Sequence, residues 1–537
     1  MSEGSRGYPA TGGWVAFVVA AALLVMVVVS LAWGDVRRNG GNLVYALDDT
    51  YIHMAVARNL AEHGTWGTDP HEFAPATSSL VWPLLLAGVF ALAGPANGAP
   101  LGLALASALG LLAASRWALR RAEIPPHLQV AGLLLLVVAT PMPTLVLTGM
   151  EHLLHAALTV VLAGIAATRL TSGPDPGPGW LAASGWDLGG IAALAVATRY
   201  EALFLAGLIV LALGWQRRWR QALATVAGSI APVIVFGIVS STHGGLFLPS
   251  SLLLKSATAS SLHAFSPGPV LAGWYTRLAY TPELLVLLLL ALLLAGHAIG
   301  DGRRREVALC MLFAGTLGTH TLLASVGWLF RYEAYLVCLG VLAVLPLAAR
   351  RVGEGLAGDP RPARRWLAAA SASLILLPLG VRATQALTRA VPATNNVYCQ
   401  HLQMARFVRE YLGGRTVALN DIGAVSYLTD AKVVDLSGLA DVEVAMARLS
   451  GSYDATWLAS HALARGVDVA MVYAGALGPV TPPGWRRVGA WRLEHNVVCG
   501  DDTVLFYAVR PGSDAALRAA LAEFGPTLPA GVRHRLD

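Results

Sequence analysis

Shortly beyond the first hydrophobic segment (14–33), the chain reads Asp48-Asp49-Thr50-Tyr51-Ile52-His53-Met54-Ala55-Val56-Ala57-Arg58-Asn59-Leu60. Two adjacent carboxylates at the point where a membrane helix emerges into water suit a general base that acts at the membrane surface. The apolar residues after them recur at helical spacing and Gly64 supplies a stop, so the stretch predicts an amphipathic helix in the membrane interface. An aspartate before such a helix is also a common N-cap, and this second interpretation stays open for Asp49.

The composition of the whole chain is that of a polytopic membrane protein. Of its 537 residues, 55% are hydrophobic and 13% are charged, whereas soluble domains carry about 25% charged residues. The net charge of +6 comes almost entirely from arginine, since Lys255 and Lys432 are the only lysines. The arginines gather in short loops between apolar runs, which indicates membrane topology and argues against a nucleic-acid partner.

Apolar segments fill most of the first 390 residues. They are 14–33, 79–94, 99–116, 127–147, 150–168, 186–198, 200–215, 221–240, 281–299, 306–327, 331–349 and 366–383. Segment 14–33 is too long for a signal-peptide core, so we expect it to remain as the first transmembrane helix. Segment 79–94 is short and has Pro83 near its start, so we expect a re-entrant or interfacial helix, which leaves about eleven crossings.

The arginine-rich loops set the expected orientation. The positive-inside rule places the clusters at 116–121, 217–220, 303–305 and 350–365 in the cytoplasm. The first outer loop (34–98) and the C-terminal part then lie outside. An alternative topology treats 79–94 as a span, joins 186–215 into one helix and puts the first arginine cluster outside. In the topology we prefer, ionisable residues from several stretches share the outer face, which predicts an extracytoplasmic active site.

From about residue 391 the composition becomes that of a soluble α/β domain, so we divide the chain into a transmembrane domain (1–390) and an extracytoplasmic domain (391–537). Strand-like runs occur at 416–419, 433–436, 467–473 and 503–507, and helical stretches at 400–412 and 440–449. The turn 420–424 follows a strand and either binds a ligand or is a strand-to-helix turn with an Asx cap. If this domain is exported, we expect a disulfide between Cys399 and Cys499.

Two further groups are candidates for ligand binding. Lys255 is the only lysine of the membrane part, and its point charge suits a phosphate, although a lysine that snorkels to the interface gives the same pattern. Glu151, His152 and His155 share helical neighbour spacings, and with His53 they are candidate ligands for a divalent metal. The sequence has no metalloprotease, serine-nucleophile or catalytic-cysteine motif. We therefore assign no metal ligand, but a divalent metal stays open as a cofactor.

Several of these stretches have counterparts in one family. They are Asp48-Asp49, Thr77-Ser78-Ser79-Leu80-Val81-Trp82, Gly149-Met150-Glu151, Arg199-Tyr200-Glu201 and Leu248-Pro249-Ser250 with Lys255. Together they resemble the GT-C superfamily, integral-membrane glycosyltransferases that use polyprenyl-phosphate-linked sugars. Within it the chain is most similar to the actinobacterial terminal arabinofuranosyltransferases, through 420–424 and 434–439 of the C-terminal domain. Tyr200, His152 and Ser250 depart from the superfamily pattern, so the resemblance points to the reaction class more than to the donor sugar.

The resemblance implies an inverting sugar transfer from a polyprenyl-phosphate donor to a cell-envelope glycan or lipid acceptor, outside a bacterial inner membrane. It implies that Asp48 is the general base and that Asp49 either orients it or forms a hydrogen bond with the acceptor. Two adjacent carboxylates raise the pKa of one of them, which suits a base near neutral pH. The residues implied for the donor phosphate are Lys255, Arg331 and Arg199, and those implied for the substrate are His53, Glu151, Glu201 and Tyr332.

Other classes of protein remain open. A transporter or lipid flippase with an exported sensor domain would show internal symmetry and discontinuous mid-membrane helices, and the sequence shows no convincing symmetry. A catalytically inactive scaffold whose C-terminal domain binds cell-wall glycan would carry the same spans. Structural interpretations also stay open for Arg331, as an interfacial anchor, and for Arg199 with Glu201, as a buried ion pair.

Overall fold

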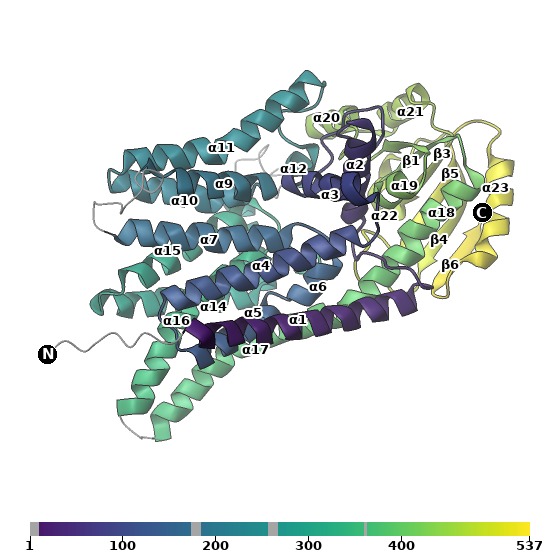
Figure 1. Ribbon diagram of the computed structural model, residues 1–537. Helices are drawn as coiled ribbons and strands as arrows, with labels where there is room; N and C mark the ends of the chain where they lie inside the picture. Colours follow the sequence, from purple (N-terminus) through teal and green to yellow (C-terminus); the bar gives the residue numbers. More distant parts are fainter. Residues whose placement is uncertain (1–9, 173–183, 256–266, 359–361) are drawn as a thin grey trace.

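A computed structural model describes residues 10–172, 184–255, 267–358 and 362–537. Helices lie side by side in a bundle, and a six-stranded sheet with its own helices covers one end of that bundle (Figure 1). Within the described residues, seven helices are long and apolar enough to cross a membrane, and four shorter apolar helices lie among them. The expected fold class, a polytopic helical membrane protein with a C-terminal α/β domain, is confirmed.

The bundle helices match the apolar segments of the sequence. The long ones are α1 (Ala10–Arg38), α4 (Ala99–Arg121), α7 (His152–Thr171), α11 (Trp219–Thr242), α14 (Pro282–Gly300), α15 (Arg304–Leu323) and α16 (Ala334–Gly358). The shorter ones are α3 (Val81–Ala93), α5 (Pro126–Ala139), α9 (Trp186–Thr198) and α10 (Ala202–Trp215). Helix α17 (Pro362–Val397) leads from the bundle into the C-terminal domain, and the boundary that we placed at 390/391 lies inside it.

Two continuous helices considered from the sequence are interrupted, one expected and one from the alternative topology. The segment 127–147 ends as α5 at Ala139 and resumes as α6 (Met142–Leu147), because Pro141 between them cannot donate a helical hydrogen bond. The single helix across 186–215 in the alternative topology is wrong. Arg199 takes an extended backbone conformation (φ −155°, ψ 135°) and ends α9 there.

Helix α2 (Asp48–His63) is the helix expected after the first span, and Gly64 ends it in a left-handed conformation (φ 72°). In Figure 1 it runs across the ends of the bundle helices, between them and the C-terminal domain. That domain covers the face which an isolated interfacial helix would leave to water. There Tyr51 packs beside Tyr427, and Arg58 donates to the carbonyls of Ser426 and Tyr427.

The C-terminal sheet has the strand order β2-β1-β3-β5-β4-β6. Strand β1 (Thr416–Leu419) pairs in parallel with β2 (Lys432–Asp435) and β3 (Val469–Tyr473). The antiparallel half consists of β4 (Arg486–Leu493), β5 (Thr503–Ala508) and β6 (Val532–Leu536). The helices are η1 (Tyr398–Leu402), α18 (Gln403–Tyr411), α19 (Gly423–Leu428), α20 (Val442–Ser450), α21 (Ala455–Ala464), α22 (Ala474–Leu477) and α23 (Asp514–Phe524). The sequence did not predict β4 or β6, whose arginines interrupt the apolar pattern of a strand.

The connection between α15 and α16 is a left-handed turn. Residues 327–330 all have positive φ, with values from 47° to 86°, and three of the four are not glycine. Each such residue costs roughly 1–2 kcal/mol, so neighbouring groups have to hold the turn. Arg382 of α17 donates to the carbonyl of Phe330 (2.9 Å) and to Glu333 (2.7 Å), and Glu333 accepts the backbone N–H of Gly327 (2.7 Å).

Candidate active site

The residues after the left-handed turn meet Asp49 at the end of the bundle that the C-terminal domain covers. Arg331 Nη2 donates to Asp49 Oδ2 at 2.7 Å and to Tyr332 Oη at 3.0 Å. Arg331 Nη1 lies 3.1 Å from the sulfur of Met150. The Arg331 side chain is 3% exposed, whereas that of Asp49 is 25% exposed. Asp49 therefore combines an accessible carboxylate with a buried cation that fixes its position.

Asp49, Ser325, Arg331 and Tyr332 stand between two cavities, because all four line both. The bundle cavity, of about 260 Å³, has mostly apolar walls and is also lined by Met150, Arg199, Tyr200, Glu201, Phe204 and Leu252. The interdomain cavity, of about 580 Å³, is more polar and is also lined by Asp48, His401, Asn420, Asp421, Ser437 and Tyr473. One reacting group at Asp49 could therefore face two molecules of different polarity.

Asp48 contacts the C-terminal domain instead. Its Oδ2 accepts the backbone N–H of Gly423 at 2.7 Å and its Oδ1 that of Ala424 at 2.8 Å. These residues open α19, so Asp48 caps a helix in the other domain and not its own helix, whose N-cap is Leu47. Burial raises the pKa of Asp48 to about 6, while the nearby His401 lowers it. Both oxygens of Asp48 are occupied by backbone N–H groups, and Asp49 alone of the pair lines both cavities.

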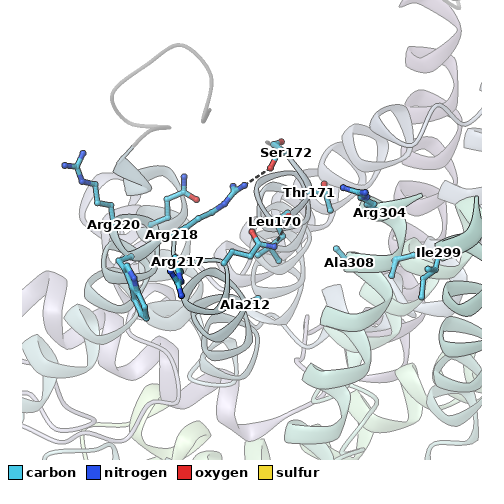
Figure 2. A pocket seen from close by; sticks show the side chains of 14 residues that line it. Leu170, Thr171, Ser172, Ala212, Arg217, Arg218, Arg220, Ile299, Arg304 and Ala308 are labelled. Atoms are coloured by element: carbon cyan, nitrogen blue, oxygen red, sulfur yellow. Dashed lines mark hydrogen bonds between the residues drawn. The ribbon is translucent and has the colours of Figure 1, made fainter. Parts of the chain in front are cut away.

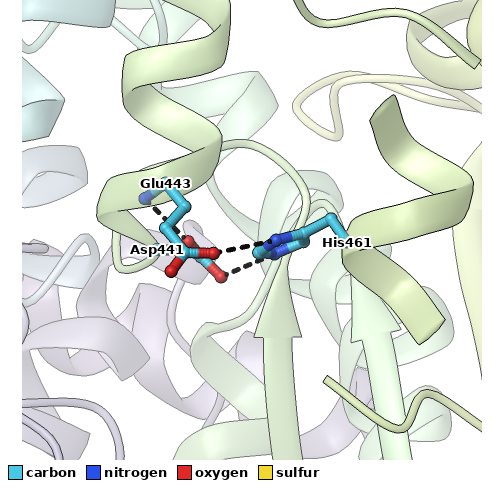
Figure 3. A group of neighbouring side chains, drawn as sticks. All are labelled: Asp441, Glu443 and His461. Carbon is cyan, nitrogen blue, oxygen red and sulfur yellow. Dashed lines mark hydrogen bonds and ion pairs between the residues drawn. The ribbon is translucent and has the colours of Figure 1, made fainter. Parts of the chain in front are cut away.

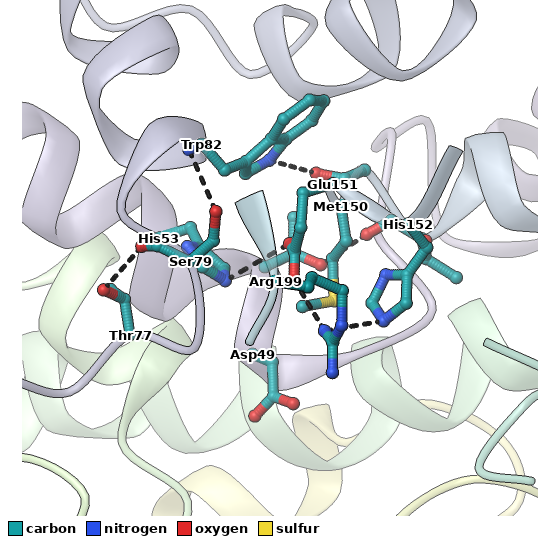
Figure 4. A network of polar contacts seen from close by, with 12 residues as sticks. Asp49, His53, Thr77, Ser79, Trp82, Met150, Glu151, His152 and Arg199 are labelled. Atoms are coloured by element: carbon teal, nitrogen blue, oxygen red, sulfur yellow. Dashed lines mark hydrogen bonds and ion pairs between the residues drawn. The ribbon is translucent and has the colours of Figure 1, made fainter. Parts of the chain in front are cut away.

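Arg199 lies at the centre of a buried polar network (Figure 4). Its Nη1 donates to Glu151 Oε1 at 2.7 Å and lies 3.0 Å from His152 Nε2, and its Nη2 donates to Glu201 Oε1 at 2.5 Å. His53 Nε2 lies 3.7 Å from Glu151 Oε2 behind this network. Arg199 and Glu201 line the bundle cavity, whereas His53 and Glu151 line neither cavity. The buried ion pair that we kept as an alternative for Arg199 and Glu201 is present.

The candidate metal ligands around Glu151 are not arranged around an open site. The guanidinium of Arg199 contacts both Glu151 and His152, which is where a divalent cation would have to lie. His155 faces elsewhere, with its ring centroid 4.5 Å from that of Tyr335. The guanidinium of Arg199 therefore takes the place of a metal ion between Glu151 and His152.

A different group of possible metal ligands lies in the C-terminal domain, formed by Asp441, Glu443 and His461 (Figure 3). His461 Nε2 lies 3.0 Å from Asp441 and its Nδ1 lies 3.1 Å from Glu443. Arg465 lies 3.2 Å from the same oxygen of Asp441. Asp441 and Glu443 each contact one ring nitrogen of His461, and Arg465 forms an ion pair with Asp441. The possible metal ligands are therefore already paired with one another and with an arginine.

The expected disulfide between Cys399 and Cys499 is absent, since both are free thiols. The sulfur of Cys499 is directed at His401, 3.9 Å from its Nδ1, and lines the interdomain cavity. Lys255 is the last residue of α12 (Ser250–Lys255), and its side chain lies outside the described part of the structure. The stretch around Lys255 is described only in part, by α12 and by α13 (Pro267–Tyr280).

The sequence did not identify His401 or Tyr473 as site residues. Asp421 Oδ2 accepts the Tyr473 hydroxyl at 2.6 Å and lies 2.9 Å from His401 Nε2. Burial lowers the pKa of His401, but Cys499, Asp48 and Asp421 together raise it well above its ordinary value. A signal was available, because Asp421 follows one expected strand and Tyr473 ends another, and the carboxyl ends of parallel strands meet at one edge.

A third cavity, of about 1350 Å³, lies at the other end of the bundle (Figure 2). Its lining includes Arg217, Arg218, Arg220 and Arg304, which belong to loops that the sequence assigned to the cytoplasm. It shares no lining residue with the other two cavities, so it is not part of the site around Asp49.

Comparison with known proteins identifies the fold. The structure is similar to a crystal structure of ArnT from Cupriavidus metallidurans in the apo state, with a TM-score of 0.50 and 16% sequence identity over 95% of this chain and 99% of that chain. A crystal structure of the same ArnT bound to undecaprenyl phosphate gives a TM-score of 0.46 and 14% identity over 94% and 99%. Residues 394–507 match a domain of unknown function (DUF8728). No curated protein matches in sequence. The first comparison shows that the chain shares the fold of ArnT.

Proposed function

We propose that this protein is an integral-membrane glycosyltransferase that moves a sugar from a polyprenyl-phosphate donor to an acceptor hydroxyl. The observation that carries the proposal is the position of Asp49 between a mostly apolar cavity in the bundle and a more polar cavity beneath the C-terminal domain. A lipid-linked donor and a hydrophilic acceptor need these two environments on either side of one base. The GT-C-like motifs and the fold shared with ArnT, a glycosyltransferase of that type, support the same class.

Asp49, in place of Asp48, is the proposed general base. Asp49 takes the proton of the acceptor hydroxyl while the acceptor oxygen forms a bond to the anomeric carbon of the donor. The bond from that carbon to the phosphate oxygen breaks, its electron pair leaves with the polyprenyl phosphate, and the configuration inverts. Asp48 is a positioning residue. Its contacts with Gly423 and Ala424 fix the start of α2, and this places Asp49, the next residue in the chain.

Cations on the bundle side would stabilise the leaving phosphate. Arg331 is the first candidate, because it lines both cavities beside the base. Lys255 remains a second candidate, since Leu252 of the same helix lines the bundle cavity one turn earlier. Arg199 is neutralised by Glu151 and Glu201, so we assign it a positioning role.

The remaining expected substrate residues divide into two groups. Glu201 and Tyr332 line the bundle cavity and are proposed to contact the donor sugar. The Tyr332 ring lies 4.8 Å from the Arg331 guanidinium and 5.7 Å from that of Arg199, so the two cations fix its orientation. His53 and Glu151 lie behind Arg199 and are proposed to hold it in place.

The site would face the outer side of a bacterial inner membrane, as the arginine-rich loops indicate. The acceptor would be a cell-envelope glycan or lipid, and an arabinofuranosyl donor is one candidate suggested by the sequence resemblance.

A transfer assay with matched aspartate variants tests the proposal. Purified wild type is given a panel of polyprenyl-phosphate sugars that includes arabinose and mannose donors, next to Asp49→Asn and Asp48→Asn. We expect transfer by wild type and a loss of about 10²- to 10⁴-fold in Asp49→Asn, the range that removal of a general base produces. Asp48→Asn should lose less and retain binding of undecaprenyl phosphate, measured as a thermal shift.

Two results would contradict this assignment. Wild type that binds undecaprenyl phosphate but transfers none of the sugars would favour a transporter or a scaffold. Loss of transfer in Asp48→Asn with full activity in Asp49→Asn would return the base to Asp48.

A further inference from the structure

The strand order of the C-terminal sheet creates a crevice that faces Asp49. From β1 the chain passes through α19 to β2 on one side of β1, and then through α20 and α21 to β3 on the other side. Such a reversal opens a crevice at the carboxyl ends of parallel strands, where open α/β sheets bind their ligands. Asn420 and Asp421 directly follow β1, and Tyr473 ends β3, so all three lie at this point.

The crevice opens into the interdomain cavity. Asn420, Asp421 and Tyr473 line that cavity, and so does Asp49 from the bundle side. Asp421 is 34% exposed and uses only Oδ2 for its contacts with Tyr473 and His401. Its Oδ1 accepts no hydrogen bond from the described residues, so the crevice presents a hydrogen-bond acceptor to the cavity.

The groups around the crevice suit a polyhydroxylated ligand. A carboxylate accepts hydrogen bonds from hydroxyl groups, and the Tyr473 hydroxyl and the His401 ring fix the carboxylate of Asp421 in one orientation. Trp328 lines the same cavity from the left-handed turn, and 51% of it is exposed. An exposed aromatic ring beside a few fixed polar groups is the arrangement that binds a ring with an apolar face and polar edges.

We propose that this crevice is the binding site for a carbohydrate acceptor, with Asp421, which Tyr473 and His401 hold in place, accepting hydrogen bonds from its hydroxyl groups so that one hydroxyl reaches Asp49. The inference rests on the proposed function and deepens it, because it makes the acceptor a saccharide. It also gives the matched domain of unknown function (394–507) a role, since both crevice residues lie within it. The bundle then selects the donor and the C-terminal domain selects the acceptor.

Protection of Cys499 from alkylation tests the binding site directly. Cys499 lines the interdomain cavity and is partly exposed, whereas the other three cysteines are buried. A maleimide should therefore label Cys499 in the whole protein, with Cys499→Ser as the labelling control. Burial raises the pKa of this thiol, so the reaction is run at alkaline pH. The probes are arabinofuranose and mannose oligosaccharides.

We expect at least one saccharide to slow the labelling of wild type several-fold and to have no effect on labelling of Asp421→Asn. Equal labelling with and without every saccharide would overturn the inference, and so would equal protection of Asp421→Asn. Protection requires no sugar transfer, so its failure is distinct from failure of the transfer assay. Protection in a wild type that transfers nothing would leave a saccharide site but refute the proposed reaction.

The acceptor KM of two tyrosine variants distinguishes a role in acceptor binding from a role in stabilising the C-terminal domain. Tyr473→Phe removes the hydrogen bond to Asp421 in the crevice, and Tyr453→Phe removes one to the carbonyl of Leu436 outside the cavity. We expect Tyr473→Phe to raise the acceptor KM about tenfold, the effect of one lost hydrogen bond, with undecaprenyl phosphate binding unchanged. Tyr453→Phe should leave the acceptor KM unchanged. Equal acceptor KM values in the two variants, or weaker lipid binding in Tyr473→Phe alone, would overturn the assignment.

Discussion

At Gly423 the first outer loop and the C-terminal domain are in close backbone contact. A Cβ added there would lie 2.2 Å from the carbonyl oxygen of Asp48 and 2.9 Å from the backbone nitrogen of Ile52. Ordinary contacts of a Cβ begin at 3.4 Å. Both obstacles are backbone atoms, so Gly423→Ala forces the start of α2 and the start of α19 to separate by more than about 1 Å.

The expected cost has two parts. Overpacking of this kind costs about 1–3 kcal/mol. The separation also lengthens the two hydrogen bonds that Asp48 accepts, and a bond to a charged group contributes about 1.5–3 kcal/mol. We therefore expect the contact between the domains to weaken by about 3 kcal/mol or more. Because Asp49 is the next residue, a shift of about 1 Å should lower sugar transfer about 10²-fold.

The assay compares Gly423→Ala with Gly413→Ala, an exposed glycine in the same domain whose added Cβ would meet no atom within 4 Å. The thermal unfolding midpoint, limited proteolysis of the C-terminal domain and sugar transfer are measured for both. We expect Gly423→Ala alone to unfold several degrees lower, to be cleaved faster and to lose transfer. If the two variants behave alike, the close contact at Gly423 does not hold the domains together and the reasoning is refuted.

Three other changes have defined outcomes. The pKa of Asp48 is about 6 in the folded protein against an ordinary value of 3.8, so its contribution to stability should fall by up to about 3 kcal/mol as the pH rises from about 4 to about 6. Asp48→Asn should remove this dependence, and equal pH slopes of the unfolding midpoints of wild type and variant would contradict it. Arg382→Gln leaves Glu333 buried without its cation and should cost about 3–5 kcal/mol, measured as a lower unfolding midpoint, whereas an unchanged midpoint would show that the turn holds without Arg382. Gly149 has φ 62° and its Cβ would lie 2.7 Å from the Tyr45 ring, so Gly149→Ala should cost about 1–3 kcal/mol, and full thermal stability of this variant would argue against that packing.

Most of the helical fold was predictable because the bilayer dictates the composition of its spans. Long apolar segments can satisfy their backbone in lipid only as helices, so segment and helix coincide for α1, α4, α7 and α11. The strands were less predictable where packing overrides local pattern. Strand β4 is one example, because Arg486, Arg487 and Arg492 interrupt its apolar residues, and its neighbours in the sheet decide its conformation.

The site was predictable in its residues more than in their contacts. The pair Asp48-Asp49 was evident, but which of the two carboxylates caps α19 depends on Gly423 and Ala424, far along the chain. Local spacing carries no information about such a partner. The sequence also suggested an ion pair of Arg199 with a near neighbour, which is present, yet it could not show that Glu151, directly before α7, joins it.

The hydrogen bond between Asp48 and Gly423 also fixes an order of events during synthesis. Its two ends are 375 positions apart, so at roughly 5–20 residues per second the first outer loop waits roughly 20–75 s for its partner. During that time several spans can already be inserted, while the loop after α1 has no helix to cap. A chain that stops before α19 can therefore be a membrane protein without a completed site. The first outer loop can form its contact with α19 only after the C-terminal domain has been translated.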